Sequence, residues 1–486
     1  MNTSVNFSDL IKGQSFARLA GNMLFNTDSY KVSMHAQYPE GTSGVYSYIE
    51  ARGGIFDETV FFGLQAFLKE YMCRPITQQD IDIAEVFYAL HGEPFNKAGW
   101  EYILREHGGR LPLVIRSVPE GTVVPVKHVL LTIEATDKNV PWLTTWAETS
   151  ILRGVWYGTT VATLAYNIRK TIAKYLELTG DPEDMLTIEY RLQDFGSRGV
   201  SSLESSGIGG SGHLLSFKGS DNIAGILAAA VYYNAGVCGV SIPAAEHSTI
   251  TSWGRENEVE AYRNMLKQFG RPGSVLAVVS DSYNIYNACE NLWGGELRQE
   301  VIDSGATVVI RPDSGDPEEV CVKVIKLLDA KFGHVVNTKG YKVLNTVRII
   351  QGDGVNEQMI ERILGHYAML GYAATNISFG MGGALLQGVN RDTQAWAMKC
   401  SAMERNNDGI WFNVQKDPIT SSAKKSKAGR VMLYTNGTGE YVSGIEGETP
   451  KQWADYGWKP ALTEIYRNGE LLTEVTFDEI RNRLWK

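Results

Sequence analysis

Three apolar runs in the second half of this chain end abruptly in residues that handle charge. They are residues 308–316, 348–354 and 377–383, and the first passes directly from apolar residues into Arg311 and Asp313. Each run is typical of a strand that is buried on both faces. Carboxylates, an arginine and glycine-rich turns at the ends of strands form a collection suited to binding a phosphorylated sugar.

Two runs nearer the N-terminus, residues 240–247 and 275–281, have the same design and add a histidine. His247 follows Glu246 at the end of the first run, and Asp281 ends the second. A single histidine is more often structural than catalytic. Here Glu246 and Asp281 can orient the ring or raise its nucleophilicity, so these three residues join Asp313 as candidate catalytic residues.

Two glycine clusters follow strand-like runs. Gly382 and Gly383 lead into a helix-like stretch, so their backbone N–H groups can approach a phosphate at the start of a helix. Gly352 precedes Asp353, whose carboxylate can then reach ribose hydroxyls or a metal-bound water. A tight turn between strand and helix is the alternative interpretation of both clusters.

The candidate site also has cationic and aromatic groups. Arg311 and Asp313 lie two residues apart and point the same way in an extended chain, so they form either an ion pair or a site for sugar or magnesium. Phe195 can stack on a flat ring, and Arg198 can hold phosphate. Core packing for Phe195 and a surface ion pair for Arg198 are the alternatives.

The elements that position these residues alternate between strand and helix from about residue 186 to 379. This alternation predicts an irregular parallel α/β barrel, in which the loops after the strands build the site. Residues 111–135 instead predict an antiparallel strand set, and residues 141–178 a long helix. We therefore expect a catalytic barrel domain at 181–390, flanked by a mixed, β-rich α+β domain formed from 1–180 and 391–486.

Composition excludes several classes of protein. The chain has 486 residues, 43% hydrophobic and 21% charged, which is typical of a globular protein. Its net charge of -9 argues against general nucleic-acid binding. The five cysteines form no metal or disulfide pattern, which favours a cytoplasmic location. The uncharged stretch 223–245 is interrupted by Asn234 and Pro243 and predicts a buried helix, a turn and a buried strand rather than a membrane span.

Seven motifs in this chain occur together in one known family. In chain order they are residues 27–31, 194–196, 243–248, 279–283, 311–315, 351–354 and 477–481. They resemble the motifs of nicotinamide phosphoribosyltransferases in order and spacing, from about residue 22 to the C-terminus. Seven collinear motifs are far more specific than any single one.

The resemblance implies a type II phosphoribosyltransferase fold and a reaction for NAD salvage. The expected substrates are nicotinamide and 5-phosphoribosyl-1-pyrophosphate, and the expected products are nicotinamide mononucleotide and pyrophosphate. ATP hydrolysis would be coupled to the reaction through phosphorylation of His247, with Mg²⁺ held mainly by substrate phosphates. The expected partner is a second copy of the chain, in a homodimer whose two active sites are shared across the interface, with no nucleic acid or membrane.

The resemblance also implies roles for individual residues. Phe195 and the partner subunit's Tyr30 would sandwich the pyridine ring, Asp221 would bind the carboxamide nitrogen, and Arg311 would contact the base. Residues expected to hold 5-phosphoribosyl-1-pyrophosphate are the ribose-binding Asp313 and Asp353, together with Arg198, Gly352, Gly382 and Gly383. The partner subunit would add Arg52 and Lys416 at the pyrophosphate and Arg391 and Lys399 at the 5-phosphate. Lys424 and Arg430 match positions near the ATP phosphates.

Three features depart from the pattern of animal members. The loop between Arg52 and Glu58 is about ten residues shorter, as judged from that pattern. Gln193 stands where a histidine is expected, and Ala397 replaces a serine expected to donate to the 5-phosphate. These differences bear on the phosphate contacts and on the tunnel behind the ring.

Two other functions remain open. Nicotinate phosphoribosyltransferases share the fold and the histidine, and Asp221 is the discriminating residue, because a carboxylate accepts a bond from an amide but repels a carboxylate substrate. A non-catalytic binding protein on the same scaffold is disfavoured, because the candidate His, Asp and Arg positions are all filled.

Overall fold

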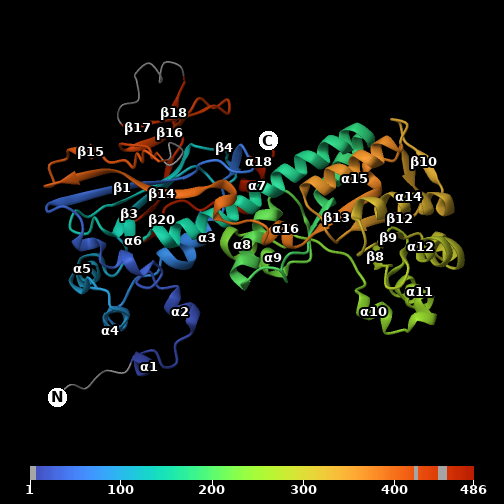
Figure 1. Ribbon diagram of the computed structural model, residues 1–486, viewed down its shortest axis with the longest axis horizontal. Coiled ribbons are helices and arrows are strands. Elements are labelled where there is room, and N and C mark those ends of the chain that lie inside the picture. The colour runs from blue at the N-terminus through green and yellow to red at the C-terminus, as the bar shows by residue number, and fades with distance from the viewer. Residues whose placement is uncertain (1–6, 421–424, 447–456) are drawn as a thin grey trace. The chain divides into compact units, whose positions relative to one another are not determined.

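The structure is a computed structural model that describes residues 7–420, 425–446 and 457–486. The chain forms two compact units (Figure 1). Unit 1 comprises residues 1–163, 232–234 and 390–486, and unit 2 comprises residues 164–231 and 235–389. The boundary thus falls inside the long helix α7, Glu148–Thr179. Whether two independently folding domains divide at 180 and 391 stays a prediction.

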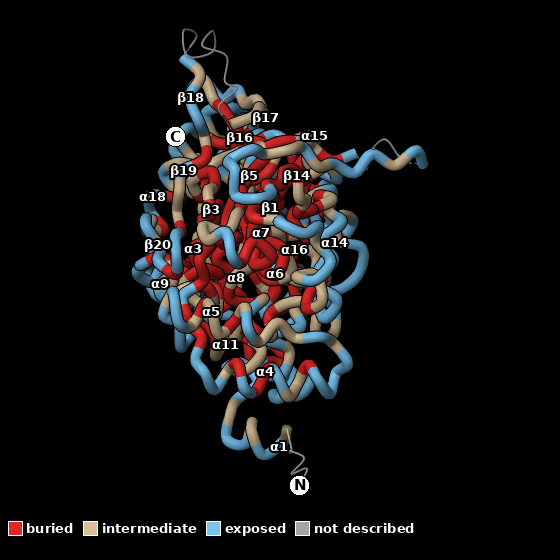
Figure 2. The backbone as a smooth tube through the Cα atoms, turned by 90° about the vertical axis from the view of Figure 1, so that its left-hand side faces the viewer, coloured by how far each residue is buried: buried red, intermediate tan, exposed pale blue. Residues whose placement is uncertain are grey.

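Unit 1 is built on a seven-stranded antiparallel sheet. Its strand order is β15 (Trp411–Asn413), β14 (Trp396–Arg405), β1 (Thr42–Ala51), β5 (Val129–Ala135), β3 (Leu113–Ser117), β19 (Thr463–Arg467) and β20 (Glu470–Leu471). Nine of the ten residues of β1 are buried (Figure 2). The β-rich character predicted for this part of the chain is confirmed.

Smaller elements complete unit 1. Two further sheets are formed by β17 (Tyr441–Ile445), β16 (Val431–Thr435) and β18 (Lys459–Pro460), and by β2 (Glu58–Val60) with β4 (Val123–Pro125). The helices are α1 (Phe7–Leu10), α2 (Phe16–Ala20), α3 (Leu64–Phe67), α4 (Gln78–His91), α5 (Lys97–His107), α6 (Leu143–Trp146) and α18 (Phe477–Leu484). Trp100, Trp142 and Trp146 pack edge to face in its core, with ring centroids 5.1–5.8 Å apart.

Unit 2 contains the predicted parallel sheet. Its strand order is β7 (Gly219–Ser220), β6 (Leu192–Asp194), β13 (Ile377–Met381), β12 (Val347–Gln351), β9 (Thr307–Arg311) and β8 (Val275–Val279), and every pairing is parallel. The central residues of these strands are buried, as their continuous apolar runs predict. The predicted α/β class is therefore confirmed.

Residues 240–245, the closing segment, connect the two edges of this sheet. Val240 pairs with Gly219 of β7, and Ala244 pairs with Ala277 of β8. The sheet therefore curls on itself and closes through an irregular segment. The buried strand predicted here is wrong, because isolated bridges replace a ladder and the side chains of Val240 and Ile242 are exposed.

Helices connect the parallel strands of unit 2. They are α8 (Leu203–Leu214), α9 (Ile223–Tyr233, which ends in unit 1), α10 (His247–Thr251), α11 (Glu258–Phe269), α12 (Ile285–Asn287), α13 (Arg298–Ser304), α14 (Pro317–Phe332), α15 (Glu357–Met369) and α16 (Gly383–Leu386), beside the hairpin β10 (His334–Val336) and β11 (Lys342–Leu344). Asp316 caps α14 by accepting bonds from the N–H groups of Glu318 and Glu319, with Pro317 at the first position. This local chemistry starts the helix directly after the site-bearing turn.

Helix α9 is not the buried helix that the uncharged sequence predicts. Ile223, Leu227 and Val231 recur every four residues and are 71%, 59% and 69% exposed. The exposed apolar face that these three side chains form on α9 is a surface available to a partner. Among the described residues, no helix is both long enough and apolar enough to cross a membrane.

Candidate active site

The predicted site residues of unit 2 follow the carboxyl ends of the parallel strands. Because these ends share one edge of the sheet, the loops after them meet around one mouth. In strand order these residues are Asp221 after β7, Phe195 and Arg198 after β6, Gly382 and Gly383 after β13, Gly352 and Asp353 after β12, Asp313 after β9, Asp281 after β8, and Glu246 and His247 after the closing segment.

His247 is held by a buried carboxylate. Its Nε2 atom lies 2.9 Å from Oδ1 of Asp281, whose side chain is only 4% exposed. The other oxygen of Asp281 accepts a hydrogen bond from the hydroxyl of Ser314. Asp281 therefore accepts a hydrogen bond from Nε2–H, and in this tautomer the lone pair of the His247 ring is on Nδ1. Glu246 is exposed and accepts a bond from Ser248, and among the described residues the ring of His247 is instead close to the carboxylates of Asp281 and Asp313.

A second carboxylate faces the free nitrogen of His247. Oδ2 of Asp313 lies 3.9 Å from Nδ1 of His247, too long for a hydrogen bond. The same oxygen accepts a 3.0 Å bond from Arg311. Nε of Arg311 is buried and has no hydrogen-bond partner within the described part of the chain. A buried N–H donor without a partner is suited to receive a ligand.

Phe195 forms an aromatic surface over a small apolar cluster. It packs against Ala277, Val309 and Ile350, which come from β8, β9 and β12. A Cβ atom at Gly380 would lie 2.0 Å from Cε2 of Phe195, so only glycine at this position leaves room for the ring. The ring is thus fixed between the sheet and the loops.

Gly352 lies beside both the aromatic ring of Phe195 and the carboxylate of Asp313. A Cβ atom placed there would lie 3.5 Å from Cε2 of Phe195 and 3.4 Å from Oδ1 of Asp313. The Phe195 ring and the Asp313 carboxylate therefore both border the space beside this glycine. A flat ring stacked on Phe195 would have its edge close to the carboxylate.

Asp221 is exposed and is held through its side chain and its backbone. Oδ1 accepts a 2.6 Å hydrogen bond from the hydroxyl of Ser241, and the backbone N–H donates to Asp194. The Asp194 carboxylate is fully buried and accepts bonds from Asn222 and from the N–H of Gly196. A buried polar network thus fixes the turn that carries Asp221.

The glycine turn after β13 is open toward ligand. A Cβ atom at Gly382 would meet only the backbone carbonyl group of Phe195, at 3.5 and 3.9 Å, so internal packing does not require glycine there. Arg198 is exposed and makes no ion pair with the residues that the structure describes. Both groups are available to an anion.

Three candidate residues of unit 1, Lys399, Arg52 and Lys416, form a basic cluster with Lys31. Lys399 lies on β14 near Lys31, Arg52 and Lys416. Burial, chiefly, and these three cations lower the pKa of Lys399, and Glu148 opposes the shift. Such a cluster favours binding of a multiply charged anion, because the anion removes the mutual repulsion.

Two other predicted residues of unit 1 are exposed on the surface. Tyr30 is 55% exposed and lies beside Lys31, whose Nζ atom is 5.0 Å from the ring centroid. Arg391 is exposed and pairs with the neighbouring Asp392 at 3.1 Å. An exposed aromatic ring and an exposed guanidinium are both free to contact a second molecule.

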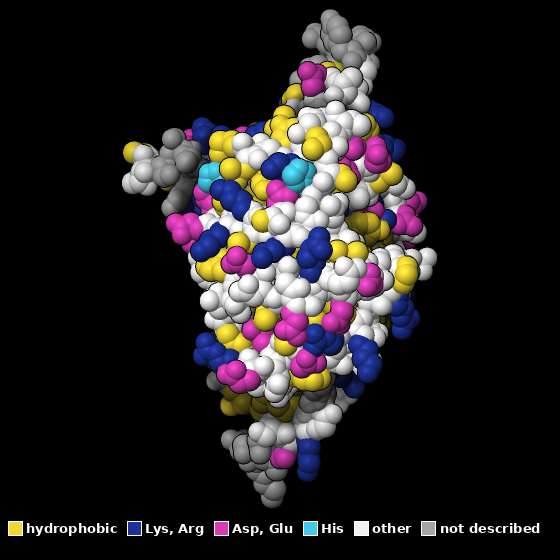
Figure 3. All heavy atoms as spheres, turned by 90° about the vertical axis from the view of Figure 1, so that its right-hand side faces the viewer, with side chains coloured by type: hydrophobic (Ala, Val, Ile, Leu, Met, Phe, Trp, Pro, Cys, Tyr) yellow, Lys and Arg dark blue, Asp and Glu magenta, His cyan; other side chains and the backbone are white. Residues whose placement is uncertain are grey.

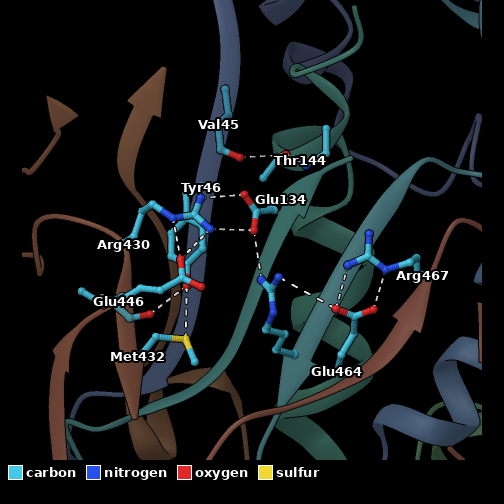
Figure 4. Close-up of polar contacts among 12 residues, drawn as sticks. Val45, Tyr46, Glu134, Thr144, Arg430, Met432, Glu446, Glu464 and Arg467 are labelled. Carbon is cyan, nitrogen blue, oxygen red and sulfur yellow. Dashed lines mark hydrogen bonds and ion pairs between the residues drawn. The ribbon is translucent and has the colours of Figure 1, made fainter. Parts of the chain in front are cut away.

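Arg430 is already bonded to two carboxylates. It contacts Glu134 and Glu446 at 2.6 Å each (Figure 4). Its guanidinium also lies 4.4 Å from the ring centroids of Tyr46 and Trp411. Its predicted contact with ATP phosphates stays a prediction, which would require rearrangement of these bonds. Lys424 lies outside the described residues.

The network around Arg430 extends across the sheet. Glu134 also pairs with Arg116, and Glu464 pairs with Arg467 (Figure 4). Burial tends to raise the pKa of Glu134, but Arg430 and Arg116 hold it below its usual value. The network ties β16 to the central sheet.

Two of the departures noted in the sequence have clear positions. Gln193 donates to the backbone oxygen of Tyr190 at 2.9 Å, and its Oε1 lies where a Cβ atom of Gly219 would be. Ala397 pairs with Glu50 across β14 and β1. The sequence analysis did not identify Ser241, Ser314 and Asn222 as members of the site. Ser314 lies within the motif 311–315 and Ser241 within the run 240–247, but no pattern marks their contacts with the carboxylates.

The architecture first defines a class. A curled parallel sheet with carboxylates, arginines and glycine turns at its carboxyl ends is the arrangement of type II phosphoribosyltransferases. The model of the nicotinate phosphoribosyltransferase (NAPRTase) family matches residues 190–467, and that of the nicotinamide phosphoribosyltransferase N-terminal domain matches residues 22–115. A nicotinate-nucleotide pyrophosphorylase from Pyrococcus furiosus shares the fold with a TM-score of 0.61 at 16% identity, over 96% of this chain and 94% of that one. Human nicotinic acid phosphoribosyltransferase does so with a TM-score of 0.54 at 16% identity, over 94% and 92%.

The sequence comparisons narrow the class. Nicotinamide phosphoribosyltransferase from Xanthomonas campestris pv. campestris is 54% identical over 95% of this chain and 97% of its own length. The enzyme of that name from Acinetobacter baylyi is 31% identical over 95% of this chain and 97% of its own length. The chain belongs to the nicotinamide phosphoribosyltransferase family.

Proposed function

We propose that the protein transfers the phosphoribosyl group of 5-phosphoribosyl-1-pyrophosphate to nicotinamide, giving nicotinamide mononucleotide and pyrophosphate for NAD salvage. Family membership supports the reaction class. The observation that carries the proposal is the convergence of Phe195, Asp221 and the Arg311–Asp313 pair around one mouth. These groups provide a stacking surface, an acceptor for an amide and a carboxylate for a sugar.

The site suits displacement of pyrophosphate from the ribose. The transition state resembles an oxocarbenium ion, so a carboxylate such as Asp313 stabilises the developing positive charge. The ring nitrogen of nicotinamide is already a nucleophile and requires no strong base. Stacking on Phe195 would hold this nitrogen in line with the sugar, and positioning is the main catalytic contribution. Arg198 and the glycine turn would contact phosphates.

Asp221 supports nicotinamide rather than nicotinate as the base. An ionised carboxylate accepts the amide N–H in a charge-assisted bond, whereas nicotinate would place two negative charges side by side. The test is kcat/KM for both bases with the wild type and Asp221→Asn. We expect the wild type to prefer nicotinamide by about a hundredfold, and the variant to narrow this ratio. A wild-type preference for nicotinate would instead support nicotinate phosphoribosyltransferase, the second candidate.

His247 is the proposed acceptor of a phosphoryl group from ATP. Asp281 holds the proton on Nε2, so the lone pair of Nδ1 would attack the γ-phosphorus of ATP. The N–P bond forms as the bond from phosphorus to the bridging oxygen breaks, and ADP leaves with that electron pair. Water later hydrolyses the phosphohistidine, which couples ATP hydrolysis to synthesis.

Mg²⁺ is the proposed metal, and it would enter with the substrate phosphates. Among the described residues, no group of three or more His, Cys, Asp or Glu side chains is placed to hold a metal by itself. Asp313 and Asp353 supply carboxylate oxygens of the kind that Mg²⁺ takes alongside phosphate and water. When bound, the ion would neutralise charge on the departing pyrophosphate.

A homodimer with shared sites is the proposed assembly. The exposed apolar face of α9, formed by Ile223, Leu227 and Val231, supports a partner surface of this kind. Tyr30 is exposed, and Lys399 belongs to the basic cluster of unit 1; both would complete the partner subunit's site. On the face drawn in Figure 3, acidic and basic side chains of the described residues are interspersed, which disfavours nucleic acid as the partner. The cytoplasmic location stays a prediction.

A further inference from the structure

Ser241 lies on the closing segment, and its backbone is held from both sides. On one side, the N–H of Val240 donates to Lys218 and the N–H of Ser220 donates to Val240. On the other side, Pro243 and Ala245 bond to Ala277 of β8 at 2.9 and 3.0 Å. None of these bonds uses the Ser241 side chain. The backbone position of Ser241 is therefore set by the sheet and does not depend on its hydroxyl.

Within the described part of the chain, the hydroxyl of Ser241 has one partner, the carboxylate of Asp221. The 2.6 Å distance from Oγ to Oδ1 is typical of a hydroxyl that donates to an ionised carboxylate. Asp221 is exposed, so without this bond its side chain can rotate among several staggered positions. With the bond, Oδ1 is engaged and Oδ2 is the oxygen left for a ligand.

We propose that Ser241 is a specificity-determining positioning residue, which holds the Asp221 carboxylate toward the 3-substituent of the pyridine base. This inference rests on the proposed function. With the carboxylate held, the amide of nicotinamide meets a preorganised acceptor. Nicotinate meets a negative charge that cannot rotate away. The bond from Ser241 to Asp221 therefore strengthens both the attraction of nicotinamide and the repulsion of nicotinate.

The experiment measures the ratio of kcat/KM for nicotinamide to that for nicotinate. Ser241→Ala removes only the hydroxyl and should lower the ratio about tenfold, through weaker use of nicotinamide and better use of nicotinate. Ser241→Thr retains a hydroxyl and should keep the ratio within about twofold of the wild type. Ser241→Cys, whose thiol is a weak donor, should resemble Ser241→Ala and provides a second variant of nearly unchanged size. Thermal unfolding confirms that each variant is folded.

A double-mutant cycle shows whether Ser241 acts through Asp221. In an Asp221→Asn background, Ser241→Ala should change the ratio much less than in the wild type, because the two residues act as one unit. An equal change in both backgrounds would overturn the proposal.

The outcomes separate this inference from the proposed function. A wild type that prefers nicotinate would overturn the proposed function. A wild type that prefers nicotinamide, with an unchanged ratio in folded Ser241→Ala and Ser241→Cys, would overturn the role of Ser241 alone. A lowered ratio in Ser241→Thr would show that shape rather than the hydroxyl matters, and would also overturn it.

Discussion

Asp281 and His247 form a hydrogen-bonded pair whose two members differ sharply in exposure. The carboxylate is 4% exposed and the imidazole is 45% exposed, at a distance of 2.9 Å. The buried member therefore fixes the tautomer, while the exposed member presents Nδ1 to incoming molecules. This division of roles favours a nucleophilic histidine over a structural one.

The first prediction concerns this pair. His247→Ala should abolish ATP hydrolysis but leave some ATP-independent synthesis, because phosphohistidine assists rather than performs ribosyl transfer. Asp281→Asn should slow phosphorylation at least tenfold, because an amide no longer stabilises the required tautomer. Acid-labile, base-stable label that the protein takes up from γ-labelled ATP measures phosphorylation of the histidine in both variants. Undiminished ATPase in His247→Ala would show that the nucleophile lies elsewhere.

The second prediction concerns the space under Phe195. Gly380→Ala would place a methyl group 2.0 Å from the ring and force it to move. We expect kcat/KM for nicotinamide to fall by about a hundredfold, because small displacements of a stacking group misalign the nucleophile. Gly236→Ala is the matched control, since a Cβ atom there meets nothing within 4 Å. Equal kinetics for the two variants would contradict the stacking role of Phe195.

The third prediction concerns pH. The lowered pKa of Lys399 means that it loses its charge at a lower pH than an ordinary lysine. Only the charged form attracts an anion, so affinity for 5-phosphoribosyl-1-pyrophosphate should fall as pH rises through this lowered pKa. The KM for this substrate between pH 7 and pH 10 is the measurement. Lys399→Arg stays charged, so this variant should keep its affinity for 5-phosphoribosyl-1-pyrophosphate at high pH. Lys267→Arg on α11 is the control and should lose affinity at high pH as the wild type does. If KM depended on pH in the same way in Lys399→Arg and in the wild type, Lys399 would be excluded from the anion site.

The fourth prediction concerns stability. Glu134→Gln leaves the largely buried Arg430 and Arg116 without a shared carboxylate, which should cost on the order of 3 kcal/mol of unfolding free energy. Arg467→Ala removes a more exposed pair with Glu464 and should cost less than about 1 kcal/mol. Denaturant unfolding of both variants makes the comparison. Similar losses would mean that burial does not set the strength of this network.

The fifth prediction concerns shared sites. Tyr30→Ala and Asp313→Ala chains should each be inactive alone, and mixing them should restore part of the activity. Restoration requires that one subunit supply the tyrosine and the other the carboxylate. Subunit exchange is verified with two different affinity tags. A verified heterodimer without recovered activity would show that each subunit builds its own site.

The sequence predicted the parallel sheet because four of its strands, β8, β9, β12 and β13, are largely apolar runs that end beside glycine, aspartate or arginine. The same strand ends led to the prediction of Asp281 and Asp313 as site residues, and their roles stay a prediction. It failed at the closing segment, where the runs are apolar but two isolated bridges to neighbouring strands replace regular pairing. Ser241 could not be found, because its role depends on the closing segment passing beside Asp221, and no local pattern records that contact.

The two-unit organisation has a consequence for synthesis of the protein. Unit 1 contains both ends of the chain, so its sheet joins strands made first to strands made last; Tyr46 of β1 bonds to Val431, 385 residues later. While the ribosome is still working, β1 lacks β14 and has an unpaired edge. The strands of unit 2 are all synthesised before β14 emerges. We therefore expect the parallel sheet to form before β1 gains its partner β14, and the unpaired edge of β1 to be exposed to aggregation until then.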